Sequence, residues 1–404
     1  MSRIVEASLG LIYDSRGTAT VEATLRTASG SVGRAGAPSG ASTGRHEVQA
    51  LPTGGVPVAL EQFRERVRPR LLTLDVQAQP EFDRALHEVD GTPGFQTIGG
   101  NVATALSVAC ALARSNENRS PLWSSIGTIG TASPVFPAIV GNCLNGGRHA
   151  IGGPDIQEFH AFSPDPDPRR SVPAALAVHR RIGEEIHRRW PDHALGRGDE
   201  GGWVAPAGNL EALEILSAAC RTVTDELHIP VHPGLDLAAS EFFDKGRYHY
   251  RDRTLDVDGQ LRFLVDLVER FDLRYIEDPF EEEDFASFAA FTDAVGSRAL
   301  VVGDDLFTTS EERVARGIRE RSANSVLIKV NQVGTLTDTL STVELARKNG
   351  WRTVTSHRSG DLPEAWLAQL AVGFGSAGLK CGLLGGERVA KLNELLRLAA
   401  STGI

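Results

Sequence analysis

A lysine interrupts one of the most apolar stretches of the chain, Val326-Leu-Ile-Lys-Val-Asn-Gln-Val-Gly334. Such a run, ended by a glycine, is typical of a strand buried on both faces of a parallel sheet. Lysine is rarely buried unless it is paired or used in chemistry, and only five of the 42 basic residues are lysines. Lys329 is therefore either the partner of a structural carboxylate or a base whose pKa its surroundings lower.

Other short apolar runs also end in ionisable groups. Six successive predicted strands each end in an ionisable residue. These residues are Asp236, Glu277, Asp304, Lys329, His357 and Lys380. Active sites of parallel β/α barrels are built from strand ends at the C-terminal face. Because a domain tolerates few buried charges, we interpret this series as one site.

Three of these strand ends are carboxylates, the oxygen ligands that a hard divalent cation binds. No Cys or His pair stands among Asp236, Glu277 and Asp304, so Mg²⁺ is favoured over zinc. Spacing cannot separate Asp304 from its neighbour Asp305. Ion pairing with arginine is the alternative interpretation, most plausible for Asp278 or Asp305.

The two strand-end lysines suggest proton abstraction. We expect Lys329 and Lys380 to lie on neighbouring strands, where mutual repulsion and burial would lower a lysine pKa and leave a free amine as base. A metal would stabilise the enediolate formed when a proton leaves the carbon next to a carboxylate. The Arg358 guanidinium and the Ser359 hydroxyl could bind an anionic group such as phosphate.

Two glycine-rich segments add further acids. Asn145–His149 is followed by Gln157 and Glu158, and Gly198–Gly202 contains Glu200. Either segment alone is a weak signal, and a single histidine such as His149 is more often a core residue than a catalyst. Glu158 and Glu200 in proximity would share protons, and one of them could protonate a leaving hydroxide.

The chain predicts two kinds of structure. Residues 3–37 alternate as antiparallel strands, and residues 57–114 predict three helical pieces. A stretch rich in Ser, Gly, Thr and Pro then places a domain boundary near residue 130, giving domains 1–130 and 131–404. Helical segments at 210–227, 261–271 and 336–348 alternate with short apolar runs, which favours an α/β fold with a parallel β/α barrel over a doubly wound sheet.

Composition excludes several classes of function. A net charge of −10 argues against nucleic acid as the main partner. No apolar run approaches the ~20 residues that span a bilayer, and the N-terminus lacks the apolar region of a signal peptide. Four cysteines without CxxC spacing, at 110, 143, 220 and 381, predict reduced thiols and a cytoplasmic location.

The chain resembles enolase along nearly its whole length. The matching segments are YDSRGxxTVE at 13–22, PSGASTG at 38–44, LNGGxHA at 144–150, QEF at 157–159, GDEGG at 198–202, LDxAxSEFF at 235–243, IEDPF at 276–280, GDDL at 303–306, IKVNQxGT at 328–335, SHRSG at 356–360 and AKLNxLLR at 390–397. The resemblance implies an N-terminal α+β capping domain and an eight-stranded barrel with an atypical first hairpin. By composition alone, residues 38–44 would be a linker; the resemblance makes them a closing loop.

The resemblance also implies roles for single residues. Lys329 would remove the C2 proton of 2-phosphoglycerate, and Glu200, beside Glu158, would expel the C3 hydroxyl. Lys380 would hold the substrate carboxylate, and Arg358 with Ser359 the phosphate. The remaining positions are lining and substrate-binding residues His149, His357 and Gln157, ligands Asp236, Glu277 and Asp304 of a first Mg²⁺, and Ser42 for a second. Glu22 and Arg397 would approach each other across a homodimer interface.

The sequence departs from the family around this core. Trp203-Val-Ala-Pro is one residue longer than usual after GDEGG, and Arg45 and Arg148 replace residues that are ordinarily uncharged or acidic. One hypothesis is therefore a paralogue acting on a phosphonate-modified analogue in antibiotic biosynthesis, such as the enzyme forming carboxyphosphonoenolpyruvate. The others are an ordinary enolase and, from another class, a non-catalytic scaffold. A racemase or cycloisomerase is disfavoured because Ile328-Lys-Val330 lacks the first lysine of a KxK motif.

Overall fold

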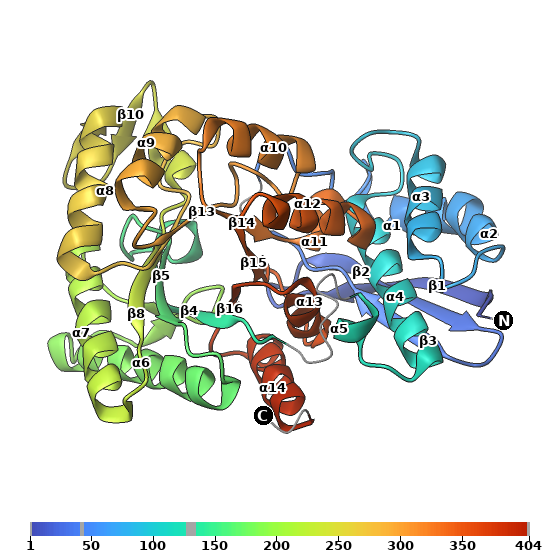
Figure 1. Cartoon of the computed structure of the whole chain (residues 1–404), viewed down its shortest axis with the longest axis horizontal. Helices are drawn as coiled ribbons and strands as arrows, with labels where there is room; N and C mark the ends of the chain where they lie inside the picture. Colours follow the sequence, from blue (N-terminus) through green and yellow to red (C-terminus); the bar gives the residue numbers. More distant parts are fainter. Residues whose placement is uncertain (1, 41–43, 127–134, 402–404) are drawn as a thin grey trace.

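The computed structural model describes residues 2–40, 44–126 and 135–401. Its N-terminal part begins with an antiparallel meander of β1 (Ile4–Tyr13), β2 (Ala19–Thr27) and β3 (Val32–Gly36), as predicted. Figure 1 shows this sheet at the right of the molecule, with helices packed against it and the barrel at the left.

Helices cover the meander. They are α1 (Gly55–Gln62), a π-helical segment (Phe63–Val67), α2 (Arg68–Leu71), α3 (Gln79–Asp90), α4 (Gly100–Asn118) and α5 (Leu122–Ser125). The predicted three pieces correspond to residues 55–71, α3 and α4. Helix α4 is buried along most of its length. It approaches β3 so closely that a Cβ at Gly33 would lie 1.9 Å from the carbonyl oxygen of Ala109, so only glycine fits there.

Eight strands form the closed barrel. Their order around the ring is β4 (Ala138–Asn145), β5 (Glu158–Ser163), β8 (His232–Asp236), β12 (Tyr275–Glu277), β13 (Leu300–Gly303), β14 (Ser325–Ile328), β15 (Arg352–Ser356) and β16 (Gly378–Gly382). Pairing of β16 with β4 closes the ring. Strand β5 is antiparallel to both neighbours, whereas the other pairs are parallel. The closure confirms the barrel and excludes a doubly wound sheet.

Helices surround the barrel strands (Figure 1). They are α6 (Pro168–Arg189), α7 (Asn209–Leu227), α8 (Val257–Phe271), α9 (Phe285–Val295), α10 (Glu311–Glu320), α12 (Leu336–Lys348), α13 (Trp366–Phe374) and α14 (Gly386–Ser401). The three barrel helices predicted from periodicity are confirmed as α7, α8 and α12. Gly350, just beyond α12, has φ of 77°, the left-handed conformation that favours glycine after a helix end.

The barrel interior is filled with apolar side chains from alternating strand positions, including Val140, Phe162, Val302, Leu327 and Val354. This packing leaves the charged residues at the strand ends. The prediction of one strand that continues through Lys329 is wrong about where the strand ends. Strand β14 ends at Ile328, and Val330–Val333 forms a helical turn, α11. The turn ends at Gly334, whose φ of 94° allows the reversal, so Lys329 lies at the rim.

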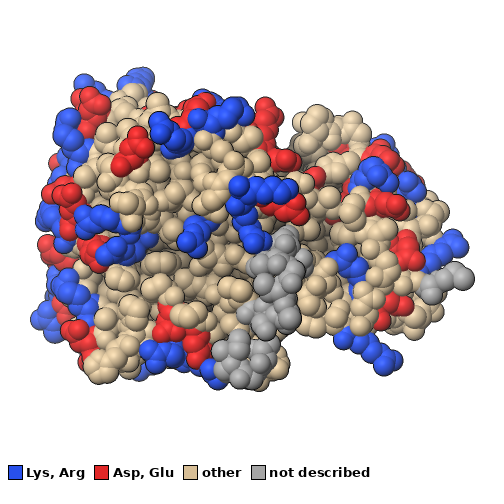
Figure 2. Space-filling model, viewed as in Figure 1, with Lys and Arg blue, Asp and Glu red and all other residues tan. Residues whose placement is uncertain are grey.

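The surface and the thiols are ordinary for a globular protein. Figure 2 shows acidic and basic side chains interspersed over the visible face. All four cysteines are buried and free. Among the described residues, no helix is both long and apolar enough to cross a membrane.

Candidate active site

The strand order distributes the site residues around the C-terminal mouth. Lys329 follows β14, and Glu158 lies on β5, four positions away in the ring of eight and therefore on the opposite side. Strands β8, β12 and β13 occupy one arc between them and carry the three carboxylates. Strands β15, β16 and β4 occupy the other arc. His357 and Arg358 follow β15, and Lys380 lies within β16.

Lys380 lies among carboxylates. Its buried Nζ donates to Asp236 at 2.9 Å and to Glu277 at 2.7 Å, and lies 3.3 Å from Glu158. The hydroxyl of Tyr275 donates a further hydrogen bond to Glu277. This arrangement brings together four of the predicted residues from four separate strands. Glu158 and Lys380 are 222 residues apart in the sequence.

Lys329 has a single carboxylate partner. Its ammonium donates to Asp304, whose other oxygen accepts a hydrogen bond from Gln332 at 2.9 Å. Burial is the largest single influence and lowers the pKa of Lys329, but the surrounding carboxylates, Asp304 foremost and Glu277 with it, together place the pKa above its ordinary value. Burial likewise opposes the charge of Lys380, but Asp236, Glu158 and Glu277 raise its pKa well above the ordinary value.

Two predictions about these lysines are therefore wrong. Lys329 and Lys380 are not on neighbouring strands, because β15 separates β14 from β16. Their pKa values are raised rather than lowered, because each ammonium contacts carboxylates that offset both burial and the repulsion between the lysines.

Glu158 and Glu200 form a buried pair. The side-chain amide of Asn142 donates to both, at 2.8 and 3.1 Å. His149 lies beside them, with Nδ1 3.5 Å from Glu158 and Nε2 3.9 Å from Glu200. His357 donates from Nε2 to Glu200 at 2.9 Å. The predicted proximity of the two acids is thus present in the structure.

Glu158 and Glu200 have pKa values shifted in opposite directions. Burial and the neighbouring Glu200 raise the pKa of Glu158 well above its ordinary value. Burial also disfavours ionised Glu200, but His357 and His149 outweigh it and hold the pKa of Glu200 well below its usual range. The two acids therefore differ in proton affinity, and Glu158 is the more readily protonated of the pair.

Helix α6 supports the loop that carries Glu200. His179 Nε2 donates to the carbonyl oxygen of Gly201 at 2.9 Å, and Trp203 Nε1 donates back to the carbonyl of His179 at 2.8 Å. The two rings pack with centroids 5.1 Å apart. Trp203 therefore anchors the loop against helix α6.

Arg388 is a site residue that the sequence analysis missed. Its side chain from α14 is fully buried. Nη1 contacts His357 Nδ1 and the carbonyl of Arg358, each at 2.6 Å, and Nη2 donates to the carbonyls of Ser359 at 2.6 Å and Asp199 at 3.1 Å. One guanidinium thus joins the loop after β15 to the loop of Glu200. Its only sequence signal was its position two residues before the AKLN segment.

Arg358 faces the N-terminal part of the chain. It binds Glu47 through both terminal nitrogens, at 2.9 and 3.1 Å, and Asn331 at 3.1 Å. Glu47 was also missed, since an acidic partner is not expected beside a phosphate site. Ser39 pairs with Gly360 through two backbone hydrogen bonds of 2.8 Å, which docks the end of the 38–40 segment on the site. Ser42 lies outside the described residues.

The acidic residues divide into ligand candidates and a structural group. Asp278 accepts backbone hydrogen bonds from Asp304 at 2.9 Å and Asp305 at 2.8 Å, so it holds the turn after β13. Its carboxylate, with those of Asp304 and Asp305, forms a compact acidic group. Only Asp304 of this group contacts Lys329 and Gln332. These contacts favour Asp304 over Asp305 as the residue that faces the site.

The donor set fits Mg²⁺. Asp236, Glu277 and Asp304 are buried oxygen donors on three adjacent strands, and lysine ammonium groups already bind all three. Burial and the neighbouring Asp236 raise the pKa of Glu277 to about 8, and a cation bound among these carboxylates would favour the ionised form of Glu277. Nearby, the buried Oε1 of Gln157 accepts no hydrogen bond from the described residues, which leaves an acceptor for a ligand.

Both unusual arginines are engaged. Arg45 lies 3.1 Å from Glu281 and 2.7 Å from Glu282, and Arg148 lies 2.5 Å from Glu241. Each guanidinium is more than half exposed and directed to a carboxylate of the barrel loops.

Comparison with known proteins agrees with this geometry. Residues 4–126 match the family model described as the enolase N-terminal domain, and residues 133–403 match the enolase C-terminal TIM barrel domain. The chain belongs to the enolase family. Its relatives named enolase include those of Methanothermobacter thermautotrophicus (44% identical; 98% of this chain and 96% of the relative covered) and Natronomonas pharaonis (43%; 99% and 100%). A third, from Methanocorpusculum labreanum, is 44% identical over 98% of this chain and 99% of the relative.

Membership of the enolase family establishes the class of reaction that this protein catalyses. This enolase-family chain is a carbon–oxygen hydro-lyase with an α/β architecture, a TIM barrel preceded by the enolase N-terminal domain. The family is Mg²⁺-dependent, in agreement with the acidic strand ends.

Proposed function

We propose that the protein dehydrates 2-phosphoglycerate to an enolpyruvate phosphate. The observation that carries this proposal is the opposed placement of a buried lysine and a buried proton-sharing acid pair across one barrel mouth. An elimination needs a base at one carbon and an acid at the oxygen leaving the next carbon. Groups from β14 and β5 approach a bound substrate from opposite sides, as an anti elimination requires.

The base in this proposal is Lys329. It takes the C2 proton as a neutral amine, so its ammonium contact with Asp304 must be released before it acts. The acid is the Glu158–Glu200 pair, in which the proton held at Glu158 can pass to Glu200 and on to the C3 hydroxyl. Lys329 and Glu200 touch the reacting atoms, whereas His357 orients Glu200 through the 2.9 Å hydrogen bond.

Mg²⁺ would be held by Asp236, Glu277 and Asp304, with Ser42 assigned to a second ion. When bound, Mg²⁺ supplies positive charge that stabilises the negative charge developing on the substrate carboxylate. Lys380 neutralises that carboxylate in the same region, since it already contacts two of the three ligands.

The phosphate would be bound on the other arc. Arg358 and Ser359 follow β15, and the Arg358 guanidinium can exchange its bidentate contact with Glu47 for a bidentate contact with phosphate. His149 and Gln157 complete the lining: His149 is neutral because burial lowers its pKa, and Gln157 has an acceptor to spare.

No observation favours a phosphonate-modified substrate or a scaffold role. Arg45 and Arg148 pair with carboxylates of this chain, so they supply no free charge for an additional anionic group. The test is a direct assay of purified protein with Mg²⁺ and 2-phosphoglycerate, followed by the absorbance of the enolpyruvate product. We expect turnover of about 1–10³ s⁻¹. Turnover of a phosphonate analogue but not of 2-phosphoglycerate would overturn the proposal.

We also propose a domain boundary near residue 130, a homodimer and a cytoplasmic location. The boundary is supported by the gap between the two matched family models. The dimer is supported by the exposed apolar side chains Val5, Leu11 and Tyr13 of β1, which lie on the strand paired with that of Glu22. Arg397, assigned to the same interface, is 66% exposed. Free buried thiols agree with a reducing compartment.

A further inference from the structure

A large hollow lies at the end of the barrel opposite the proposed active site. Its volume is about 1150 Å³, and its lining includes the first residues of β8, β13 and β15 and the residue before β12. These strands carry the site residues at their other ends, so the hollow is a second, separate opening of the same barrel. Ligand pockets commonly measure about 300–1,000 Å³, and this one therefore has room for a small molecule with its water.

The lining of this hollow has one sign of charge. It contains four arginines, Arg274, Arg298, Arg347 and Arg352, together with His232, and no Asp or Glu. The chain as a whole carries 52 acidic and 42 basic residues. An opening whose only side chains with a permanent charge are arginines is contrary to that excess of acid and creates a local positive potential.

Part of this charge has an ordinary explanation. Arg347 lies in the last turn of α12, where a cation stabilises the carbonyl end of a helix. Asp272, just outside the hollow, lies 2.7 Å from Arg274, 4.0 Å from Arg298 and 3.2 Å from His232. One carboxylate therefore serves two arginines and a histidine, which leaves the group positive.

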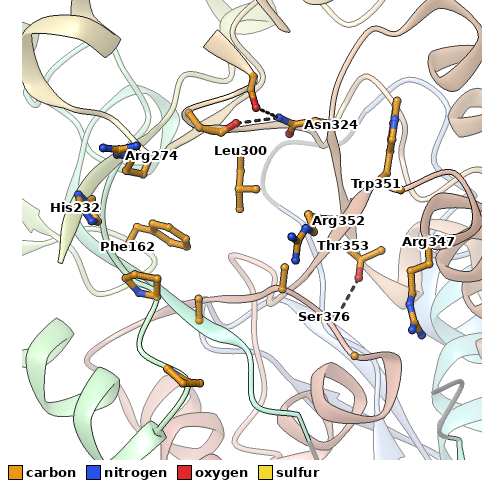
Figure 3. Close-up of a pocket in the computed structure, with 18 of the residues that line it drawn as sticks. Phe162, His232, Arg274, Leu300, Asn324, Arg347, Trp351, Arg352, Thr353 and Ser376 are labelled. Atoms are coloured by element: carbon orange, nitrogen blue, oxygen red, sulfur yellow. Dashed lines mark hydrogen bonds between the residues drawn. The ribbon is translucent and has the colours of Figure 1, made fainter. Parts of the chain in front are cut away.

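Arg352 has no such explanation. It is the exposed first residue of β15, not part of a helix end, and no carboxylate of the described chain forms an ion pair with it. Figure 3 shows Arg352 near the middle of the opening, between Phe162 and Trp351, with Arg274 and His232 on the side of Phe162 and Arg347 beyond. A guanidinium in this position presents its donors to whatever enters the hollow.

We propose that this hollow binds a small organic anion carrying several phosphate charges, with Arg352 as the principal contact and Arg274 and Arg298 as supporting charges. Guanidinium groups bind phosphate oxygens bidentately. Phe162, Trp351 and Leu300 supply apolar surface for the body of the ligand. A long nucleic acid is disfavoured because the protein carries a net charge of −10.

Calorimetric titration of the full-length protein with inorganic triphosphate and with ATP tests the proposal. We expect one site per chain, weakened by salt and unaffected by saturating 2-phosphoglycerate. Arg352→Gln should weaken binding at least tenfold. Arg64→Gln, which removes an exposed arginine of the N-terminal part, is the matched control and should bind as the unmodified protein does.

Asp272→Asn provides the opposite variant. It removes the carboxylate nearest the hollow and retains a residue tolerated at its left-handed φ of 53°, so binding should tighten several-fold. Absence of binding at millimolar ligand, competition by 2-phosphoglycerate, or equal affinity in Arg352→Gln would overturn the proposal. Tighter, Arg352-dependent binding of a single-stranded RNA would overturn it in favour of nucleic acid. Because heat of binding is measured, these outcomes do not depend on lyase activity.

Discussion

Arg388 Nη1 lies 2.6 Å from Nδ1 of His357 inside the barrel wall. Because a guanidinium has only donors, Nδ1 of His357 must accept, and the ring proton of the neutral imidazole is fixed on Nε2. Burial lowers the pKa of His357 to about 4, so the ring is neutral at physiological pH. Nε2 then donates to Glu200. Arg388 thus sets the His357 tautomer whose Nε2–H is directed at Glu200.

Arg388→Lys is expected to lower kcat by roughly 100-fold or more, because the ordering of Glu200 affects the acid step. Loss of a buried charge network also costs stability, about 3–5 kcal/mol, so thermal unfolding must be measured alongside. The ¹⁵N shifts of His357 should report a mixture of tautomers. Recovery of activity with added guanidinium would support the positioning role, and an unchanged tautomer would contradict it.

Lys329→Ala should fold and bind Mg²⁺ yet lose exchange of the C2 proton of 2-phosphoglycerate with solvent. General base catalysis contributes about 10²–10⁴-fold, and the loss should be at least of this size. The measurement is proton exchange in D₂O by NMR. Lys348→Ala, which removes an exposed lysine on α12, is the control. Continued exchange in Lys329→Ala would mean that the base is another residue.

Substitutions of Asp304 and Asp278, which follow the adjacent strands β13 and β12, should differ in their effect on Mg²⁺ affinity. Asp304→Asn should weaken Mg²⁺ binding roughly 100-fold or more, because it removes an ionised ligand. Asp278→Asn should instead lower stability by about 1–3 kcal/mol, since Asp278 accepts two buried backbone hydrogen bonds. Thermal unfolding with and without Mg²⁺ measures both, as an ion at 100 times its Kd adds about 2.7 kcal/mol. The reverse pattern would assign the ion to Asp278.

Stability should fall in mildly acidic solution through His179. Burial lowers the pKa of His179 to about 4, from an ordinary value of 6.5. Above pH 6.5 neither state binds the proton and stability is unaffected; between pH 6.5 and about 4 the unfolded state binds it, and stability falls by up to about 3 kcal/mol. His179→Gln, which retains a donor to Gly201, should show a flatter decline in urea unfolding across this interval. An unaltered slope would exclude His179 as the source.

The strand ends were predictable because their chemistry is local in sequence. Each short apolar run finishes in one charged residue, and parallel strands in a barrel bring such ends to one mouth. Asp236, Glu277 and Asp304 follow from this rule. The opposed placement of Lys329 and Glu158 did not follow, because it depends on the antiparallel insertion of β5 and on the order in which the ring closes.

The electrostatic partners were not predictable. Repulsion between Lys329 and Lys380 was the natural expectation from two like charges, but the nearer carboxylates decide the pKa of each. Arg388 and Glu47 act through contacts 31 and 311 residues away in sequence, with His357 and Arg358 respectively. Pattern and spacing carry no information about such distant contacts.

The pairing of β16 with β4 also has a consequence during protein synthesis. Strand β16 supplies Lys380, and α14, after it, supplies Arg388, so the ribosome delivers both only after the other seven barrel strands. Until then β4 has an open edge, which can pair with other chains. The N-terminal meander and its helices can fold early, whereas the site is complete only when β16 and α14 have been added. A ribosome-bound chain that ends before residue 378 is expected to require protection from aggregation and to be inactive.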